Sequence, residues 1–194
     1  HHTRGSDRQH VLAAQGMRFT QGYANSPVCS PTRFALMSGR YQYRLPGGSE
    51  EPLTFARMKR APGLLGFPPE HPSLPSLLRG AGYRTALVGK WHLGTPPEFD
   101  PLRSGYEEHF GCYGGGLDYH SYLTMGGDRD LWDNGQPAPG SGYLTDRLTD
   151  RAVDFVQRCA HSDEPFLLSL HYTAPHWPWQ TREDEAESRR IGSA

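Results

Sequence analysis

The strongest constraint on the fold is a repeated order in which an amphipathic helix is followed by a short apolar strand. Residues 145–159 place apolar side chains at helical spacing, and residues 166–172 form an apolar run of strand length. Residues 73–79 also have a helical pattern, which glycines close, and residues 83–88 follow as a strand. Helices that alternate with strands favour parallel strand pairing. We therefore predict an α/β fold with a largely parallel central sheet.

Local signals predict the remaining elements. Gly16 and Gly39 mark helix ends, and the Asn134-Gly135 pair marks a hairpin turn, because these residues adopt positive φ at little cost. The density of Pro and Gly predicts irregular structure over residues 46–72, and residues 106–127 are also predicted as loop. The other predicted elements are a helix over 7–15, a strand over 17–23, a helix from Ser30 that stops before Gly39, loops over 89–94 and 173–176, and a solvated helix face over 183–187.

The composition is that of an ordinary globular chain. The 194 residues suffice for one domain, and the 20 basic and 21 acidic residues leave a net charge of -1. No overall charge therefore selects nucleic acid or membrane as the partner, and an anionic substrate needs local positive groups. No apolar run reaches membrane-spanning length, and the polar first residues lack the apolar core of a signal peptide, so the compartment is not indicated.

The cysteines argue against two other classes of protein. Cys29, Cys112 and Cys159 are too few and too far apart for a disulfide framework or a CxxC zinc site. A zinc or redox protein is therefore disfavoured. Taken singly, each cysteine is most simply a small buried hydrophobic residue.

Polar residues of interest recur after the predicted strands. Cys29 lies a few residues beyond the first predicted strand. Lys90 and His92 directly follow the second, and His176 directly follows the third. In open α/β sheets, ligands bind beyond the carboxyl ends of the strands. We therefore expect these four residues to gather at one edge of the sheet and to form a single site.

The predicted helix start next to Cys29 suits an anion. Ser30 is a good N-cap residue and Pro31 favours the first helical position, so free backbone N–H groups would face whatever lies there. Arg33 in the first turn adds a fixed positive charge. Such a place would hold a sulfate or phosphate ester and would lower the pKa of a thiol. An ordinary Ser-Pro helix cap with a buried cysteine nearby is an equally good explanation of the spacing alone.

Three segments of the sequence resemble the sulfatase family. Residues 29–33, Cys-Ser-Pro-Thr-Arg, match the C-x-P-x-R signature of sulfatases, and both flanks of this motif are similar too. Residues 89–94, Gly-Lys-Trp-His-Leu-Gly, resemble the second signature of the family. Residues 166–176 resemble the strand and loop that carry a substrate-binding histidine. The resemblance runs from about Leu12 to Arg190.

The resemblance implies an alkaline-phosphatase-like α/β sandwich that is incomplete here. Residues 1–194 would form a partial sulfatase catalytic domain, with residues 1–11 as an atypical N-terminal segment. The implied activity is that of an arylsulfatase-like hydrolase that uses Ca²⁺ to cleave a small-molecule or glycan sulfate ester. A separate formylglycine-generating enzyme would first oxidise Cys29 to formylglycine.

The same resemblance implies a role for each site residue. Cys29, as formylglycine, would supply the nucleophile, and Arg33 would stabilise its hydrated form. Lys90 and His176 would bind the sulfate oxygens, where they stabilise charge that develops in the transition state. His92 would assist the deprotonation of the hydrated aldehyde.

Residues outside these motifs have simpler explanations. Trp177 and Trp179 either line the entrance for substrate or pack against neighbouring prolines. The remaining histidines are predicted to be structural: His10, His71, His109, His120, His161 and His171.

The calcium ligands that the resemblance implies are missing from the sequence. Sulfatases bind Ca²⁺ through two adjacent aspartates on an N-terminal strand and through an Asp-Asn or similar pair beyond the region of His176. Here Asp7 is the one acidic residue before Cys29, and no Asp-Asn follows His176. The Asp133-Asn134 pair precedes His176 and is explained by a turn. We therefore predict no metal ligands in this chain, and little or no activity of this chain alone.

Two alternatives remain open. A phosphate or phosphonate ester hydrolase of the same superfamily would use the same nucleophile, and the missing metal ligands leave nothing in the sequence to separate the two activities. A non-catalytic product of a truncated gene, or an anion-binding pseudoenzyme, would also retain the motifs. A truncated chain is expected to expose surface that normally belongs to the core.

Overall fold

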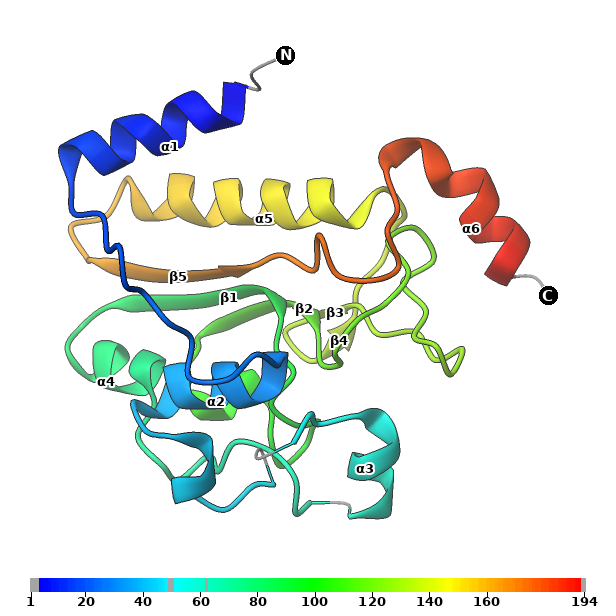
Figure 1. The fold of residues 1–194 in the computed structure, drawn as a ribbon, viewed down its shortest axis with the longest axis horizontal. Coiled ribbons are helices and arrows are strands. Elements are labelled where there is room, and N and C mark those ends of the chain that lie inside the picture. Colours follow the sequence, from blue (N-terminus) through cyan, green and yellow to red (C-terminus); the bar gives the residue numbers. More distant parts are fainter. Residues whose placement is uncertain (1–3, 49–50, 62, 193–194) are drawn as a thin grey trace.

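The computed structural model describes residues 4–48, 51–61 and 63–192. A central sheet lies between helices on both faces (Figure 1). The helices and strands are, in chain order, α1 (Arg4–Gln15), α2 (Cys29–Ser38), α3 (Phe55–Arg60), α4 (Leu74–Gly80), β1 (Arg84–Lys90), β2 (Glu108–Cys112), β3 (Trp132–Asp133), β4 (Gln136–Pro137), α5 (Leu144–Cys159), β5 (Phe166–His171) and α6 (Glu185–Gly192), with single 3₁₀ turns at Gln42–Arg44, Pro101–Ser104 and Arg182–Asp184.

The sheet confirms the predicted α/β class. Its strand order is β4-β3-β2-β1-β5. β1 lies at the centre and pairs in parallel with β2 on one side and with β5 on the other. The short β3 and β4 add an antiparallel extension next to β2. All three parallel strands therefore end at the same edge of the sheet.

Helices cover both faces of β1, which explains why this strand is almost continuously apolar. Successive side chains of a strand point to opposite faces. Val88 packs with Leu148 of α5, whereas its neighbour Leu87 packs with Phe34 of α2. α5 lies on one side of the sheet, and α2 and α4 lie on the other (Figure 1).

The predicted helix over 145–159 is confirmed as α5, and its apolar stripe is buried against the sheet. The strand after it, β5, is less buried than predicted. Phe166 is 40% exposed and Leu170 is 37% exposed, although the sequence favours a buried strand here. The reason is position: β5 forms an edge of the sheet, and no further strand of the described residues pairs with it.

The predicted strand over 17–23 is wrong. α1 forms as predicted and ends before Gly16, but the segment that follows it has no strand structure. Met17, Phe19 and Tyr23 are 78%, 77% and 85% exposed. A strand needs a hydrogen-bonded neighbour, and nothing in the described part of the chain pairs with this segment. Its alternating pattern therefore leaves apolar side chains in solvent.

Tertiary pairing extends one strand and creates another. β1 continues two residues beyond the predicted end, so Lys90 is the last residue of the strand and not part of the following loop. β2 lies inside residues 106–127, which were predicted as loop. Its register runs from Ala86↔Glu108 to Lys90↔Cys112. The strand contains His and Gly and has a weak local signal, so the ladder with β1 decides its conformation.

Three smaller predictions have different outcomes. The hairpin turn is confirmed: Asn134 and Gly135 have φ of 49° and 81°, and Asp133 pairs with Gln136. The irregular segment over 46–72 contains a helix that was missed, α3, whose N-cap Thr54 accepts a hydrogen bond from the backbone of Arg57. The solvated helix face over 183–187 is confirmed in part, since α6 begins at Glu185 and carries exposed charges.

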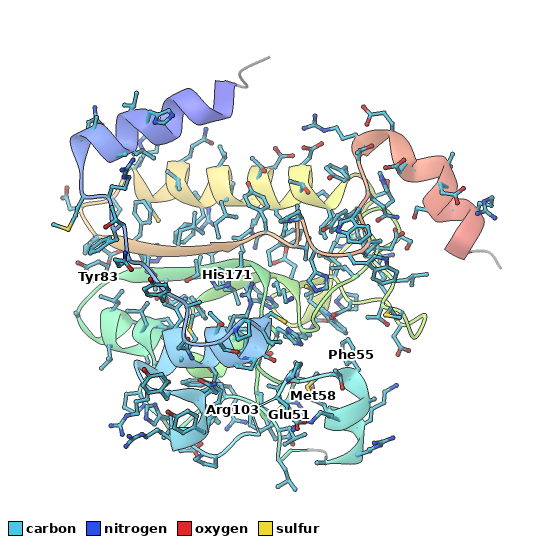
Figure 2. The ribbon with its side chains drawn as sticks, viewed as in Figure 1. Glu51, Phe55, Met58, Tyr83, Arg103 and His171 are labelled. Carbon is cyan, nitrogen blue, oxygen red and sulfur yellow. The ribbon has the colours of Figure 1, made fainter. Side chains whose placement is uncertain are left out.

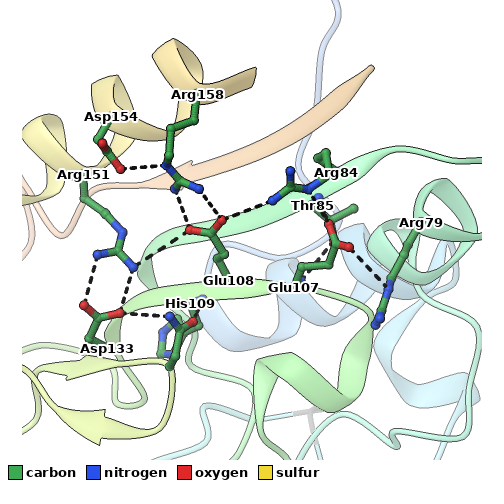
Figure 3. Close-up of polar contacts among 11 residues, drawn as sticks. Arg79, Arg84, Thr85, Glu107, Glu108, His109, Asp133, Arg151, Asp154 and Arg158 are labelled. Carbon is green, nitrogen blue, oxygen red and sulfur yellow. Dashed lines mark hydrogen bonds and ion pairs between the residues drawn. The ribbon is translucent and has the colours of Figure 1, made fainter. Parts of the chain in front are cut away.

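Ion pairs tie α5 to the start of β2, at the amino end of the parallel strands (Figure 3). Glu108 accepts two hydrogen bonds from Arg158, at 2.8 and 2.7 Å. Arg84 and Arg151 also lie within 4.0 Å of the Glu108 carboxylate. Arg151 in turn forms a second pair with Asp133 of the hairpin.

No described helix is long and apolar enough to cross a membrane.

Candidate active site

The N-terminus of α2 lies two residues earlier than predicted. The helix begins at Cys29, and its N-cap is Val28 with φ of -119°, so Ser30 is not the cap. The Ser30 hydroxyl is instead buried and accepts a hydrogen bond from the backbone N of Leu53 at 2.8 Å. This bond joins α2 to the segment before α3. Cys29 is therefore the first residue of a helix whose N-terminus is held in place by the hydrogen bond between Ser30 and Leu53.

Two cations lie next to Cys29 with no carboxylate partner. Arg33 donates a hydrogen bond from Nη1 to the backbone O of Lys90 at 2.8 Å. Lys90 is only 3% exposed, and its side chain lies within hydrogen-bonding reach of Cys29. Among the described residues, no Asp or Glu lies within 4.0 Å of either cation. Burial lowers the pKa of both groups, and the proximity of Arg33 lowers the pKa of Lys90 further.

His171 also contacts Arg33, although it was predicted to be structural. Its Nδ1 lies 2.8 Å from Arg33 Nη1 (His171 is labelled in Figure 2). Nδ1 also lies 3.2 Å from the carbonyl O of Lys90, to which it could only donate. The contact with Arg33 is shorter and arginine can only donate, so we assign Nδ1 as an acceptor on a neutral ring with its proton on Nε2. Burial, followed by the charge of Arg33, lowers the pKa of His171 to about 4. The sequence contained a signal for this residue, because His171 ends the same type of strand that places Lys90.

His92 is held in a single tautomer. Its Nε2 lies 2.8 Å from the carbonyl O of Leu53, which can only accept, so Nε2 carries the proton. Nδ1 is then an unprotonated acceptor, and it is buried with no partner among the described residues. Burial, followed by the charge of Lys90, lowers the pKa of His92 to about 3. The backbone of His92 has a positive φ of 57°.

Cys29, His92 and His176 line one cavity of about 620 Å³, which we call the cysteine cavity. The Nδ1 of His176 lies 2.7 Å from the carbonyl O of Trp177 and donates to it, which leaves Nε2 for a ligand. Arg33 does not line this cavity. It lines a neighbouring cavity of about 480 Å³ together with His171, and Cys29 borders both. Lys90 lies within hydrogen-bonding reach of Cys29 but lines neither cavity.

The loop after β2 supports both cavity histidines, a role that sequence reasoning missed. A Cβ on Gly115 would lie 2.7 Å from Cε1 of His92, and a Cβ on Gly116 would lie 3.1 Å from Nδ1 of His176. A side chain at position 115 would therefore force the His92 ring to shift, and one at position 116 would crowd the His176 ring. The run of three glycines at 114–116 was visible in the sequence, but it was interpreted as loop composition.

The calcium that sulfatases use has no fitting site in these residues. No group of three or more His, Cys, Asp or Glu side chains in the described ranges could hold a metal ion. The buried Asp130 carboxylate already accepts hydrogen bonds from Tyr113 N at 3.1 Å, Gly114 N at 2.8 Å and Trp132 Nε1 at 2.9 Å. A hard cation needs about six or more oxygen ligands, so these residues do not by themselves form a calcium site.

The fold and the site together define an α/β protein with a positively charged sheet edge, where two cations that have no carboxylate partner among the described residues lie next to a cysteine at a helix N-terminus. A family model described as Sulfatase matches residues 5–193, which includes most of the N-terminal segment that was predicted to be atypical. The chain belongs to the sulfatase family and has its alkaline-phosphatase-like fold.

Similar proteins give the same result. N-acetylgalactosamine-6-sulfatase of Sus scrofa is 38% identical over 181 residues, which cover 86% of this chain and 34% of that protein. N-acetylglucosamine-6-O-sulfatase of Bacteroides thetaiotaomicron is 29% identical over 168 residues, which cover 87% of this chain and 26% of that protein. The crystal structure of Ps i-CgsB in complex with k-i-k-neocarrahexaose has a TM-score of 0.71 and 32% identity, and the match covers 87% of this chain and 40% of that one. This chain therefore spans about a third of the length of its curated relatives.

Proposed function

We propose that the complete protein hydrolyses sulfate esters of glycans, with a formylglycine made from Cys29 as the nucleophile. The observation that carries this proposal is a pair of cations, the buried Lys90 and the partly buried Arg33, which adjoin Cys29 and have no carboxylate partner in the described part of the chain. Buried charge without a partner is costly, so it indicates an anionic ligand that supplies the missing charge. A sulfate ester group has this charge.

The chemistry of formylglycine explains why a cysteine occupies this position. A separate maturation enzyme oxidises Cys29 to the aldehyde, which adds water to form a geminal diol. One diol oxygen attacks sulfur, and the bond from sulfur to the ester oxygen breaks, so that the alcohol leaves. The second hydroxyl then loses its proton, the aldehyde re-forms and the bond from carbon to the sulfate oxygen breaks. Sulfate is released and no external nucleophile has to enter.

The surrounding residues have the groups that these steps require. Arg33 and Lys90 stabilise negative charge on the diol and on the sulfate oxygens. His92 lines the cysteine cavity, and its unprotonated Nδ1, which has no partner among the described residues, would accept the proton of the second hydroxyl. His176 contacts a sulfate oxygen through Nε2. A sulfate oxygen can only accept, so Nε2 must donate. Because Nδ1 already donates to the carbonyl O of Trp177, the ring carries both protons when sulfate is bound.

The relatives support a glycan as the substrate. Two of them are named for the 6-sulfates of N-acetylgalactosamine and N-acetylglucosamine, and Ps i-CgsB was crystallised with k-i-k-neocarrahexaose. An aryl sulfate, although it is not the proposed natural substrate, should also be hydrolysed and is therefore a convenient assay substrate. A phosphate or phosphonate ester remains the second candidate, since the cations beside Cys29 would hold either tetrahedral anion.

We further propose that residues 1–194 alone have little or no turnover. They contain no fitting calcium site in the described ranges, and the segment after α1 exposes Phe19 and Tyr23 instead of pairing in the sheet. The nucleophile and its cations would then survive in a chain that lacks the other parts of the active site.

The test is hydrolysis of a chromogenic aryl sulfate by the chain co-expressed with a formylglycine-generating enzyme, with and without Ca²⁺. Mass spectrometry first establishes that Cys29 is converted, and Cys29→Ala is the control. The phosphate ester of the same phenol runs in parallel. Calcium-dependent sulfate turnover that Cys29→Ala abolishes would support the nucleophile and refute the inactivity of the short chain. Faster hydrolysis of the phosphate ester would favour the second candidate.

A further inference from the structure

A second cavity adjoins the cysteine cavity. Its volume is about 390 Å³, and both cavities are lined by Gly116, Thr124, Met125 and Trp177. It lies where the loop between β2 and β3 meets the segment after β5 and the helix α6 (Figure 1). Both volumes are in the range of sites that bind small organic molecules. A ligand whose reacting group lies beside Cys29 can therefore continue directly into the adjoining cavity.

We propose that the adjoining cavity binds the sugar next to the sulfated sugar, so that the substrate is a sulfated oligosaccharide and not a free monosaccharide sulfate. This inference rests on the proposed hydrolysis of sulfate esters at the cysteine cavity. It goes further by specifying that the substrate contains at least two sugars. Three features of the adjoining cavity support a sugar as its occupant.

The first feature is an aromatic side chain at the junction of the two cavities. Trp177 lines both of them and is 49% exposed, so part of its indole is accessible to a ligand. A flat aromatic face packs well against the C–H face of a sugar ring. Leu123, Met125 and Pro178 extend the apolar wall on the side of the adjoining cavity.

The second feature is a pair of hydroxyl groups with protons to donate. Ser121 Oγ accepts from Leu123 N at 3.4 Å, and Thr124 Oγ1 accepts from Gly126 N at 3.2 Å. Neither hydroxyl proton has an acceptor among the residues that the structure describes. A hydroxyl both donates and accepts, so each group can still donate to a sugar oxygen.

The third feature is the Asp118 carboxylate in the cavity wall, which hydrogen bonds within the protein already hold in position. Asp118 accepts hydrogen bonds from Ser121 N at 2.7 Å, Ser188 Oγ at 2.6 Å and Gln180 Nε2 at 2.5 Å. These bonds join the loop after β2 to α6. The negative carboxylate disfavours a second sulfate group in this cavity, so the sugar bound here is expected to be uncharged.

The test measures binding to the unmodified chain, which keeps the Cys29 thiol and cannot form the diol. Titration calorimetry compares a monosaccharide, N-acetylgalactosamine 6-sulfate, with a disaccharide in which the same sulfated sugar is joined to a neutral sugar. A second pair is built on N-acetylglucosamine 6-sulfate. We expect the disaccharide of one pair to bind about tenfold more tightly than its monosaccharide.

Two variants should remove this difference, and one should keep it. Trp177→Ala removes the aromatic face, and Ser121→Trp fills the adjoining cavity without changing a residue of the cysteine cavity. Either should leave the two sugars within about twofold of each other. Trp179→Ala is the matched control, because Trp179 is 80% exposed and lines neither cavity. Circular dichroism establishes that each variant is folded.

The outcomes separate this inference from the function on which it rests. Disaccharides that bind no more tightly than monosaccharides in both pairs, or an advantage that survives both Trp177→Ala and Ser121→Trp, would overturn the oligosaccharide inference. Monosaccharide binding that is unchanged by Lys90→Met would instead contradict the proposed sulfate site. Monosaccharide binding that depends on Lys90, together with a disaccharide advantage that depends on Trp177, supports both.

Discussion

The two ends of the parallel sheet contain similar cations in opposite settings. At the amino end, Glu108 pairs with Arg84, Arg151 and Arg158, and these side chains remain between 18% and 44% exposed (Figure 3). At the carboxyl end, Arg33 and Lys90 have no carboxylate within 4.0 Å among the described residues. One end neutralises its charge internally and the other does not.

This difference distinguishes charges that hold the structure together from charges that serve a ligand. The hydrogen bonds from Arg158 lower the pKa of Glu108, so this end of the sheet is stabilised by ionisation. Burial lowers the pKa of Lys90, so its charge is a cost until an anion binds. The comparison predicts that changes at the amino end affect stability and that changes at the carboxyl end affect function.

The largest expected effect is a loss of stability in mild acid. The pKa values of His92, His109 and His171 in the folded chain are about 3, 3 and 4, below the ordinary value of 6.5. The unfolded chain therefore takes up more protons, so their contribution is present above pH 6.5 and is lost as the pH falls. Each histidine should reduce the free energy of unfolding by up to about 2 kcal/mol between pH 6.5 and 5. Urea denaturation at several pH values measures this change.

A variant tests the origin of this acid sensitivity. His171→Gln keeps an acceptor for Arg33 but cannot be protonated. The loss of unfolding free energy between pH 6.5 and 5 should therefore be smaller by the contribution of one histidine, up to about 2 kcal/mol. Equal stability of the original chain at pH 7 and pH 5 would show that these rings are not held neutral.

The second prediction concerns activity in the complete, matured protein. Lys90→Met should lower kcat/KM by about 100- to 1,000-fold, because it removes a charge that stabilises the transition state. Its stability should not fall, since the charge is buried and has no carboxylate partner among the described residues. Arg158→Met at the amino end is the matched control and should leave kcat/KM within about twofold of the original protein. A similar loss of activity in both variants would break the comparison between the two ends.

The third prediction concerns stability at the amino end. Glu108→Gln leaves Arg84, Arg151 and Arg158 without this carboxylate and should lower the free energy of unfolding by about 1–2 kcal/mol after screening by solvent. Asp146→Asn removes a surface ion pair to Arg182, whose two side chains are 41% and 68% exposed, and it should cause little measurable change. Urea denaturation at neutral pH compares the two variants, and equal effects would contradict the structural role of Glu108.

The smallest expected effect tests the glycine loop. Gly115→Ala places a Cβ 2.7 Å from the His92 ring, so the ring must move, and kcat in the complete protein should fall about tenfold. Gly80→Ala is the control, because nothing lies within 4 Å of its added Cβ. Its activity should not change. Full activity of Gly115→Ala would mean that the position of His92 is not critical.

Much of the framework could be predicted because its signals are local. The spacing of apolar residues predicted α5, and an Asn-Gly pair predicted the hairpin turn. Of the candidate site residues, Lys90, His92 and His176 were predicted from their positions at strands that the structure contains. The strand predicted before Cys29 does not form, so only its motif pointed to that residue. Where the signals were not local, the predictions were wrong: β2 was missed, and the segment over 17–23 was assigned a strand that does not form.

The sequence by itself determined the fold class, the family and the residues that belong together, because periodicity and motif spacing are properties of the chain. Only the tertiary structure decided how these residues are divided between two cavities and which histidines are neutral. It brought His171 to Arg33 over 138 positions and Leu53 to His92 over 39. A proton's position depends on burial and on the atom across the hydrogen bond, and neither exists until distant segments have packed together.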